Sequence, residues 1–390
     1  MSPLRVWYAD GPDSPRTSPR DAVAAAGLDD GADLDVMLDV TLGWTIEPHP
    51  WLDDTTLSIT TVLAGYGLAR AVNAGRVTAL PVRLSAVPSR ILANPPDVAV
   101  VTGVRRGDHC AFSTAVGWGD VLARTAERVV VEIGLTAPDL GGPLVEGQIV
   151  ATLERPMPVG PMPTAPAASR VADSIDLSIG ATVAALLPEE PTLQFGPGGI
   201  AEGIARSIDQ PVRIWSGLVT DAVAELHDRG LLIEPAVAAY TWGGEPIERL
   251  AEAGMLRLSS STVTHDLSAI SAIPRFVGCN TALQVGLDGA VNLERVGDRI
   301  VAAVGGHADF SAGASRSVGG MSIVALRSTT RTGESTIVPR VDVVSTARSD
   351  VDVVVTEHGI ADLRGVSDTE RARRLIAVAD PVHRDGLSRL

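Results

Sequence analysis

Residues 192–208 read TLQFGPGGIAEGIARSI. The first four residues are typical of a buried strand, GPGG is typical of a tight turn, and the remainder predicts a helix. A strand that passes through a short turn into a helix is the building unit of folds in which helices cover a parallel sheet. Such a turn also points unpaired backbone N–H groups from the positive end of the helix, which suits a phosphate or an oxyanion. A purely structural connection is the alternative interpretation.

The same alternation continues along the chain in both directions. Short β-branched runs predict buried strands at Val98–Val101, Val129–Ile133, Val212–Ile214, Ile323–Leu326 and Val351–Val355. Helical patterns cover Asp21–Ala26, Trp118–Ala126, Val219–Asp228 and Asp368–Ala379. The last of these begins with Ser367 as an N-cap and Glu370 in the capping-box position. These patterns predict an α/β fold with mainly parallel sheets.

The length of 390 residues favours two domains. The stretch ERPMPVGPMPTAPAASRVADS, residues 154–174, is rich in Pro, Ala and Ser and has no periodicity. It therefore predicts a connector. We predict an N-terminal α/β domain over residues 1–160, a connector over 161–175 and a C-terminal α/β domain over 176–390.

The composition excludes several classes of function. All 32 cationic residues are arginine, so neither a Schiff-base lysine nor a phosphate-binding loop ending in Gly-Lys-Ser/Thr can be present. The net charge of −15 and the lack of a basic run argue against nucleic acid or an anionic membrane surface as a partner. Cys110 and Cys279 show no metal-ligand or disulfide spacing, and we expect two small buried side chains and no metal. No apolar run reaches the roughly 18 residues of a membrane span and no signal peptide is evident, so we expect a soluble, cytoplasmic protein.

Two further segments carry residues suited to chemistry. Residues 304–321, VGGHADFSAGASRSVGGM, predict a loop framed by two Gly-Gly pairs, whose small side chains would let another molecule approach the backbone. Residues 351–366, VDVVVTEHGIADLRGV, predict a strand whose end is followed by Asp362 and Arg364. This pair either faces a site at the strand end or forms a structural ion pair.

Together these segments resemble the acetyl-CoA hydrolase/transferase family, which includes 4-hydroxybutyrate CoA-transferase. GGHADFSAGASRSVGGMSIVAL is similar to the GGQ-x-DF loop of the family, and IVPRVDVVSTARSDVDVVVTEHGIADLRG and RARRLIAVADPVHRDGL are similar to its C-terminal signature. TLQFGPGGI falls at the TLQ-G-I-G segment of the family, and NPPDVAVVTGVRRGDHCAFSTAVGWGDV resembles its proline-aspartate segment. The resemblance covers about three quarters of the chain and leaves out the first 75 residues or so.

The resemblance implies two similar open α/β domains of the CoA-transferase type with the active site between them. It implies coenzyme A, bound as an acyl-CoA substrate, and a homodimer. In the family a glutamate attacks the acyl-CoA and gives an acyl-glutamyl anhydride and then a glutamyl-CoA thioester. By position, the CoA-binding and oxyanion-binding groups would be the backbone amides of two loops and one cation. These residues are Gly196, Gly198, Gly199, Ile200, Gly305, Gly306 and Arg316, with Arg364 as a second candidate for the phosphates of CoA.

The sequence departs from the family at the nucleophile. The glutamate position falls on Gly217, and no acid lies between Asp209 and Asp221. Trp215 and Gly217 would reshape the acyl pocket. Ser216 is a candidate replacement nucleophile, although the sequence shows no base beside it. His307 replaces a glutamine of the family and could act as a general base, or it could simply replace the hydrogen bond of that glutamine.

Three hypotheses follow. In the first, the protein cleaves the thioester, or passes the acyl group to an acceptor, without a glutamyl-CoA intermediate. In the second, it is a CoA-transferase whose acid comes from elsewhere, such as a partner subunit or the N-terminal region. In the third, it is a non-catalytic CoA-binding or partner protein that has lost its nucleophile.

Overall fold

The structure is a computed structural model that describes residues 3–28, 37–135, 137–155 and 172–389. It is a mixed α/β fold with two large, mainly parallel sheets, as the sequence predicts. Its residues form two compact units, each discontinuous in sequence. The first contains the described parts of residues 1–163, 237–264 and 300–303, and the second contains those of 164–236, 265–299 and 304–390. Most of the predicted connector, residues 161–171, lies outside the described residues, and the predicted domain limits stay a prediction.

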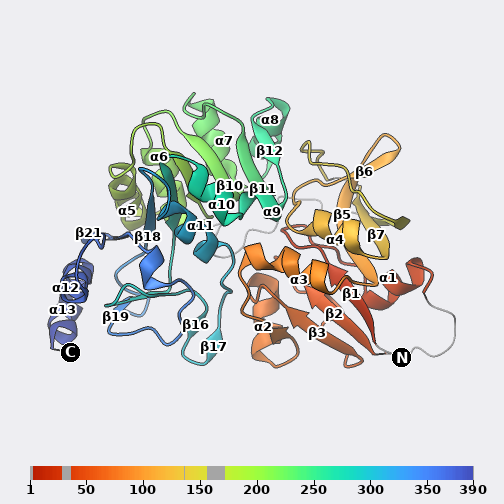
Figure 1. Ribbon diagram of the computed structural model, residues 1–390, viewed down its shortest axis with the longest axis horizontal. Helices are drawn as coiled ribbons and strands as arrows, with labels where there is room; N and C mark the ends of the chain where they lie inside the picture. Colours follow the sequence, from red (N-terminus) through yellow and green to blue (C-terminus); the bar gives the residue numbers. More distant parts are fainter. Residues whose placement is uncertain (1–2, 29–36, 136, 156–171, 390) are drawn as a thin grey trace. The chain divides into compact units, whose positions relative to one another are not determined.

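The first unit is built on a sheet with the strand order β4-β3-β2-β1-β5-β7-β8 (Figure 1). The strand pairs along this path are parallel, and β6 pairs with β5 in the antiparallel sense. The strands are β1 (Leu4–Tyr8), β2 (Leu38–Leu42), β3 (Leu57–Thr61), β4 (Thr78–Ala79), β5 (Val98–Arg106), β6 (His109–Ala111), β7 (Arg128–Gly134) and β8 (Ile149–Arg155). The helices are α1 (Pro19–Ala25), η1 (Tyr66–Leu68), α2 (Ala69–Asn73), η2 (Leu84–Ala86), α3 (Val87–Ala93) and α4 (Gly119–Thr125).

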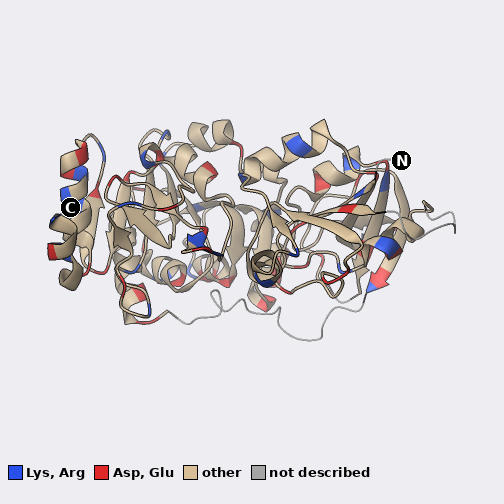
Figure 2. Ribbon diagram, turned by 90° about the horizontal axis from the view of Figure 1, so that it is seen from below, with Lys and Arg blue, Asp and Glu red and all other residues tan. Residues whose placement is uncertain are grey.

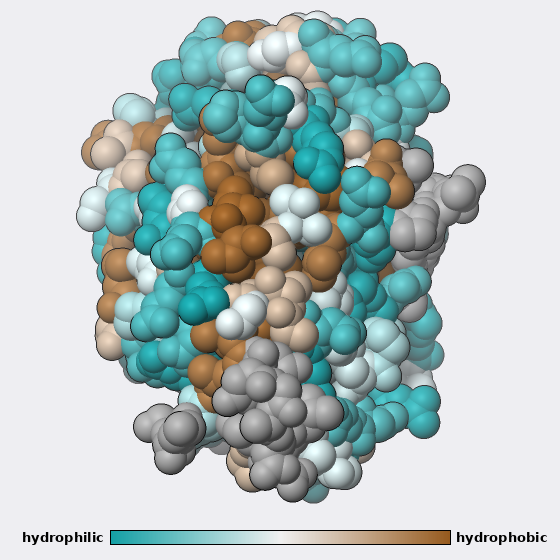
Figure 3. Space-filling view, turned by 90° about the vertical axis from the view of Figure 1, so that its right-hand side faces the viewer, coloured by the Kyte–Doolittle hydropathy of each residue, from teal (hydrophilic) through white to brown (hydrophobic). Residues whose placement is uncertain are grey.

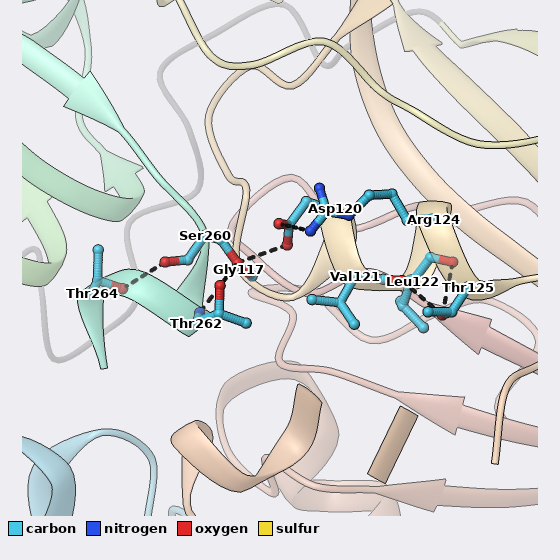
Figure 4. Close-up of polar contacts among 9 residues, drawn as sticks. All are labelled: Gly117, Asp120, Val121, Leu122, Arg124, Thr125, Ser260, Thr262 and Thr264. Carbon is cyan, nitrogen blue, oxygen red and sulfur yellow. Dashed lines mark hydrogen bonds and ion pairs between the residues drawn. The ribbon is translucent and has the colours of Figure 1, made fainter. Parts of the chain in front are cut away.

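A later segment of the chain completes the first unit. Residues 237–264 carry most of β11 (Ala236–Trp242), with α8 (Glu245–Glu252), β12 (Leu256–Leu258) and α9 (Ser261–Thr264). Figure 4 shows how the start of α9 is held against α4. The Ser260 hydroxyl donates to the Asp120 carboxylate at 2.8 Å, and the backbone N–H of Ser261 donates to the Gly117 carbonyl at 2.6 Å.

The second unit has neighbouring strands in the order β10-β9-β13-β18-β20-β21. All pairs in this order are parallel except β20 with β21. Its strands are β9 (Thr192–Phe195), β10 (Arg213–Thr220), β13 (Phe276–Asn280), β18 (Met321–Ala325), β20 (Val353–Thr356) and β21 (Gly359–Asp362). Its helices are α5 (Ser174–Ala184), α6 (Gly199–Ser207), α7 (Asp221–Asp228), α10 (Leu267–Ala272), α11 (His307–Ala314), η3 (Arg348–Asp350), α12 (Asp368–Val378) and α13 (Pro381–Ser388). Short strands β14 (Gln284–Gly286), β15 (Val291–Asn292) and β19 (Ile337–Val338) form a separate small sheet, and β16 (Arg295–Val296) pairs with β17 (Arg299–Ile300).

The predicted elements agree well with these bounds, with two differences. The helix predicted from Val219 begins at Asp221 instead, because β10 continues to Thr220. Residues 304–321, predicted as a loop, contain the helix α11, so that prediction was wrong. All eight residues of α11 are buried, and its small Ala, Gly and Ser side chains allow it to pack closely against β13 and β18. Ser367 caps α12 as predicted, accepting from the backbone N–H of Glu370.

Charged and apolar residues are distributed over the surface of both units. In the view of Figure 2, acidic residues and arginines are interspersed along the ribbon, as on α12, where Glu370 pairs with Arg373 and Arg374. Figure 3 shows a face on which apolar residues form a brown area between polar ones. At the edge of the first sheet, Ile149 and Val150 of β8 are exposed.

Candidate active site

The glycine-rich turn after β9 combines a structural requirement with open space. Gly198 has φ +124°, a backbone conformation that favours glycine. A Cβ atom at Gly199 would overlap the carboxylate of Asp176 on α5, so the packing of α5 against α6 also requires glycine there. At Gly196 a Cβ would meet nothing within 4 Å. Gly196 is therefore the position of this turn where a ligand could approach the backbone.

Strand β10 places the three residues at the predicted nucleophile position on opposite faces. Because side chains alternate along a strand, Trp215 and Gly217 share one face and Ser216 points to the other. Trp215 is partly buried and packs against a cluster that includes Ile270 and Phe310. The Ser216 hydroxyl is buried and donates to the carbonyls of Phe195 and Leu218, 3.2 and 2.9 Å away. Both of these hydrogen bonds of the Ser216 hydroxyl are made to backbone carbonyls.

The space beside Gly217 is filled by another side chain. A Cβ atom at Gly217 would lie 2.9 Å from Nε2 of His265 and 3.3 Å from a ring carbon of Phe310. A Cβ at Gly306 would lie 2.7 Å from the same Nε2 atom. The imidazole of His265 therefore lies between the backbones of Gly217 and Gly306, and its ring centre is 4.8 Å from that of Phe310. Both glycines are needed because the histidine takes the volume of their side chains.

His265 is a neutral, buried group. It is 2% exposed and precedes Asp266, the N-cap of α10. Burial lowers its pKa to about 3, so the ring carries no charge at neutral pH. His265 is a site residue that sequence reasoning missed. No motif around it signals its position, because its neighbours Gly217 and Gly306 are distant in sequence.

His307 is the first residue of α11 and directly follows Gly306, the N-cap. Its Nδ1 atom lies 2.8 Å from the hydroxyl oxygen of Thr346 and 3.3 Å from that of Ser311. Its Nε2 atom is buried and has no hydrogen-bond partner in the described residues. Burial lowers the pKa of His307 to about 4, which keeps the imidazole neutral at pH 7. The arrangement orients one ring nitrogen and leaves the other buried without a partner in the described residues. Thr346 is a neighbour that sequence reasoning missed.

The two glycines before His307 and the two candidate arginines are not grouped together. Gly305 has φ +56°, in the left-handed region, and sets the turn into α11. Arg316 follows the other end of this eight-residue helix, roughly 12 Å away along its axis. It donates to the Ala312 carbonyl and lies 3.9 Å from the Asp350 carboxylate. The Arg364 guanidinium forms two hydrogen bonds with the Asp362 carboxylate, so these two residues form an ion pair.

Two expected absences can be examined only within the described residues. In those ranges no helix is long and apolar enough to cross a membrane. In the same part of the chain, no three His, Cys, Asp or Glu side chains gather so as to hold a metal ion. Cys110 and Cys279 are both buried and free, as the sequence predicts.

Known proteins are similar to this chain in sequence and in fold. The family model of the acetyl-CoA hydrolase/transferase C-terminal domain matches residues 247–389. The 4-hydroxybutyrate coenzyme A transferase of Clostridium kluyveri is 30% identical over 338 residues, which cover 81% of this chain and 78% of that protein. An acetyl-CoA hydrolase of Eremothecium gossypii is 27% identical over 400 residues, covering 85% and 74%.

The fold is also similar to that of a solved CoA-transferase structure. A crystal structure of 4-hydroxybutyrate CoA-transferase from Porphyromonas gingivalis superposes with a TM-score of 0.75 at 24% identity, covering all of this chain and 93% of that one. At this identity the likeness bears on the fold alone. The identity and coverage of the Clostridium kluyveri relative show that the chain belongs to the acetyl-CoA hydrolase/transferase family.

Proposed function

We propose that the protein is an acyl-CoA enzyme that hydrolyses a CoA thioester, or transfers its acyl group to an acceptor, without a glutamyl-CoA intermediate. The relatives named as CoA transferases and acetyl-CoA hydrolases support CoA thioesters as the substrate class. The expected homodimer and the expected cytoplasmic location stay predictions.

One observation supports a mechanism without a glutamyl-CoA intermediate. The position that the family resemblance assigns to the nucleophile is Gly217, and His265 and Phe310 occupy the space into which a side chain there would extend. The site therefore has no carboxylate at this position, and the histidine leaves no room for a small conformational change to supply one. Ser216 offers little as a substitute, since its hydroxyl donates to backbone carbonyls on the other face.

In the proposed mechanism His307 is the general base. We assign the ring proton to Nδ1, 2.8 Å from the Thr346 hydroxyl oxygen, to which it then donates. In this tautomer the lone pair of Nε2 can take a proton from water or from an acceptor hydroxyl. The oxygen then attacks the thioester carbonyl carbon, and the carbonyl oxygen becomes negatively charged. Backbone N–H groups at the start of α11 and at the turn near Gly196 would stabilise that charge. The C–S bond then breaks, and the proton on Nε2 passes to the CoA sulfur.

The experiment is a measurement of free thiol released from a panel of acyl-CoA thioesters, with and without carboxylic acid and alcohol acceptors. We expect release with the wild type and its loss in His307→Gln, which keeps a hydrogen-bonding side chain but has no base. The matched control is His109→Ala, because His109 is exposed on β6. Full activity of His307→Gln would remove this base from the mechanism.

Two further readouts separate the other hypotheses. Exchange of CoA between two carboxylic acids, together with a hydroxylamine-sensitive protein thioester, would identify a CoA-transferase. Thermal stabilisation by CoA without thiol release from any thioester would identify a binding protein. A ligand at 100 times its dissociation constant stabilises by about 2.7 kcal/mol, which is easily measured.

A further inference from the structure

Two amide side chains on the second sheet are buried next to each other. Gln194 is on β9 and is 4% exposed, and Asn280 is the last residue of β13 and is 9% exposed. Nε2 of Gln194 donates to Oδ1 of Asn280 at 3.2 Å. The other two polar atoms, Oε1 of Gln194 and Nδ2 of Asn280, are buried and have no hydrogen-bond partner among the described residues. The pair therefore presents one acceptor and one donor that nothing else uses.

This count does not depend on how the two amides are oriented. Turning both side-chain amides by 180° exchanges oxygen and nitrogen with little change of shape. Asn280 would then donate to Gln194, and the two remaining atoms would again be one donor and one acceptor. A buried polar atom without a partner is rare in native folds and calls for a bound group or a functional role.

Helix α11 runs along β13 in the opposite direction. At the start of the strand, the backbone N–H of Phe276 donates at 3.0 Å to the hydroxyl of Ser317, which follows the end of the helix. Two residues further along the strand, a Cβ atom at Gly278 would lie 3.2 Å from the Phe310 carbonyl oxygen and 3.3 Å from Cβ of Ala314. Each step toward the carboxyl end of β13 therefore leads toward the first residue of α11.

His307 lies at the level of the amide pair. Two residues of a strand span about 6.6 Å, which is the length of four to five residues of a helix. The step from Gly278 to Asn280 therefore leads from the middle of α11 to its first residue, His307. Oε1 of Gln194 lies on the same face of the sheet, 3.5 Å from a Cβ atom at Gly278. Nε2 of His307, likewise buried without a partner in the described part of the chain, thus joins the two amide atoms.

There is open space beside the amide pair. Gly196 follows Gln194 by two residues, and a Cβ atom there would meet no heavy atom within 4 Å. A buried water molecule needs room for about one sphere of its own size and two to four polar partners. The carboxyl ends of β9 and β13 provide both, and ligands of open α/β sheets bind at such strand ends.

The three unpartnered atoms match the hydrogen-bonding groups of one water molecule. Water has two protons and two lone pairs. It can donate one proton to Oε1 of Gln194 and the other to Nε2 of His307, and one lone pair can accept from Nδ2 of Asn280. The second lone pair then has no partner and remains for attack on a carbonyl carbon.

We propose that Gln194, Asn280 and His307 bind the water molecule that attacks the thioester, so that the protein is a hydrolase. This inference rests on the proposed function and selects water as the acyl acceptor. The water oxygen forms a bond to the thioester carbonyl carbon while one of its protons moves to Nε2 of His307. The C–S bond then breaks, the proton on Nε2 passes to the sulfur, and the products are a carboxylic acid and free CoA.

The test removes the polar atoms of the amide pair with little change of side-chain size. For Gln194→Met and Asn280→Leu, we expect kcat for thiol release, with water as the only acceptor, to fall by about tenfold or more. We expect KM to change by less than about twofold, because the amides contact the water and not the thioester. Gln148→Met is the matched control, because Gln148 is exposed in the first unit. The melting temperature of each variant checks that it is folded.

A crystal structure of the full chain provides a second measurement that does not depend on turnover. We expect one water molecule within hydrogen-bonding distance of all three atoms in the wild type, and its loss in Gln194→Met. Wild-type kcat in Gln194→Met, or a protein side chain in the place of the water, overturns the inference. Thiol release that occurs only after an alcohol acceptor is added also overturns it and leaves the proposed acyl transfer intact. If no thioester releases thiol with or without an acceptor, the proposed function fails together with this inference.

Discussion

The imidazole of His265 takes the space of a side chain at Gly217: a Cβ atom there would lie 2.9 Å from Nε2 and 3.1 Å from Cε1 of the histidine. Real Cβ atoms are not found at the shorter of these separations, so any residue larger than glycine must displace the ring. Displacement is restricted on the far side, because Gly306 and Phe310 also contact the imidazole. The two residues are therefore coupled, and substitutions at one position should depend on the other.

The coupling between Gly217 and His265 can first be measured through the free energy of unfolding. We expect Gly217→Ala to lower the free energy of unfolding by about 1–3 kcal/mol, the usual cost of overpacking a buried site. Gly196→Ala is the matched control, because a Cβ there would meet nothing within 4 Å, and we expect a change within about 0.5 kcal/mol. Urea denaturation of both variants checks the difference. Equal stability of the two variants would show that the His265 ring can move away from residue 217 without loss of stability.

Chemical trapping tests the same coupling in function. Gly217→Glu alone should form no covalent CoA adduct, because His265 prevents its carboxylate from taking a productive position. In Gly217→Glu/His265→Ala the ring is gone, and we expect a glutamyl-CoA thioester that hydroxylamine traps after addition of an acyl-CoA. Mass spectrometry of the peptide that contains residue 217 provides the measurement. An adduct in the single variant would contradict the view that His265 blocks this position.

Local patterns were sufficient to predict most of the fold. The β-branched runs at Val98 and Val129 lie in β5 and β7, and TLQF forms β9 ahead of α6, because periodicity and turn residues act within a few positions. The exception, α11, has the sequence HADFSAGA, whose small and polar residues give no clear helical period. Its helix is specified by packing between other elements, which the sequence of the segment does not reveal.

The site was harder to predict than the fold. The sequence predicts a departure at Gly217 because one position of a motif lacks its acid, but the proposed consequence depends on His265, 48 positions further along the chain. Thr346 and His307 are similarly distant in sequence and meet only through tertiary structure. Single-sequence reasoning identifies which residue types are missing, whereas the contacts that replace them require the fold.

Burial of His265 makes stability depend on pH. Its folded pKa is about 3, against roughly 6.5 in an unfolded chain. Above pH 6.5 the ring is neutral in both states. As the pH falls below 6.5 only the unfolded state binds a proton, so the free energy of unfolding falls by up to about 1.4 kcal/mol per pH unit. His265→Phe should reduce this slope by a similar amount between pH 6.5 and 4.5 in denaturation experiments.

Comparing His265→Phe with the wild type at each pH cancels the contributions of other titrating groups to the free energy of unfolding. Burial raises the pKa of Asp10 to about 7 and that of Asp13 to about 6, and these groups oppose the histidines over the same range. Their contribution is common to the wild type and to His265→Phe. His109→Phe is the control, because this histidine is exposed on β6. If the free energy of unfolding depended on pH equally in His265→Phe and in the wild type, His265 would be protonated in the folded protein as readily as in the unfolded chain.

Thr346 should act on catalysis through His307. Thr346→Val keeps the shape of the side chain but removes the hydroxyl 2.8 Å from Nδ1, so the imidazole loses the contact that orients it. The Ser311 hydroxyl, 3.3 Å from Nδ1, remains. We expect kcat for thiol release to fall by about tenfold, as for the loss of one hydrogen bond, with KM nearly unchanged, and Thr346→Ser to restore most of the loss. A purely structural role would lower stability without this split between kcat and KM.

The dependence of wild-type activity on pH is a second test of His307 as the general base. Because the pKa of His307 is lowered to about 4, the base is already neutral at pH 5, and kcat/KM should stay level between pH 8 and 5 as far as this group is concerned. Activity should fall only as the pH approaches 4. A decline of kcat/KM centred near pH 6.5 would contradict a base that works from a fully buried, neutral state.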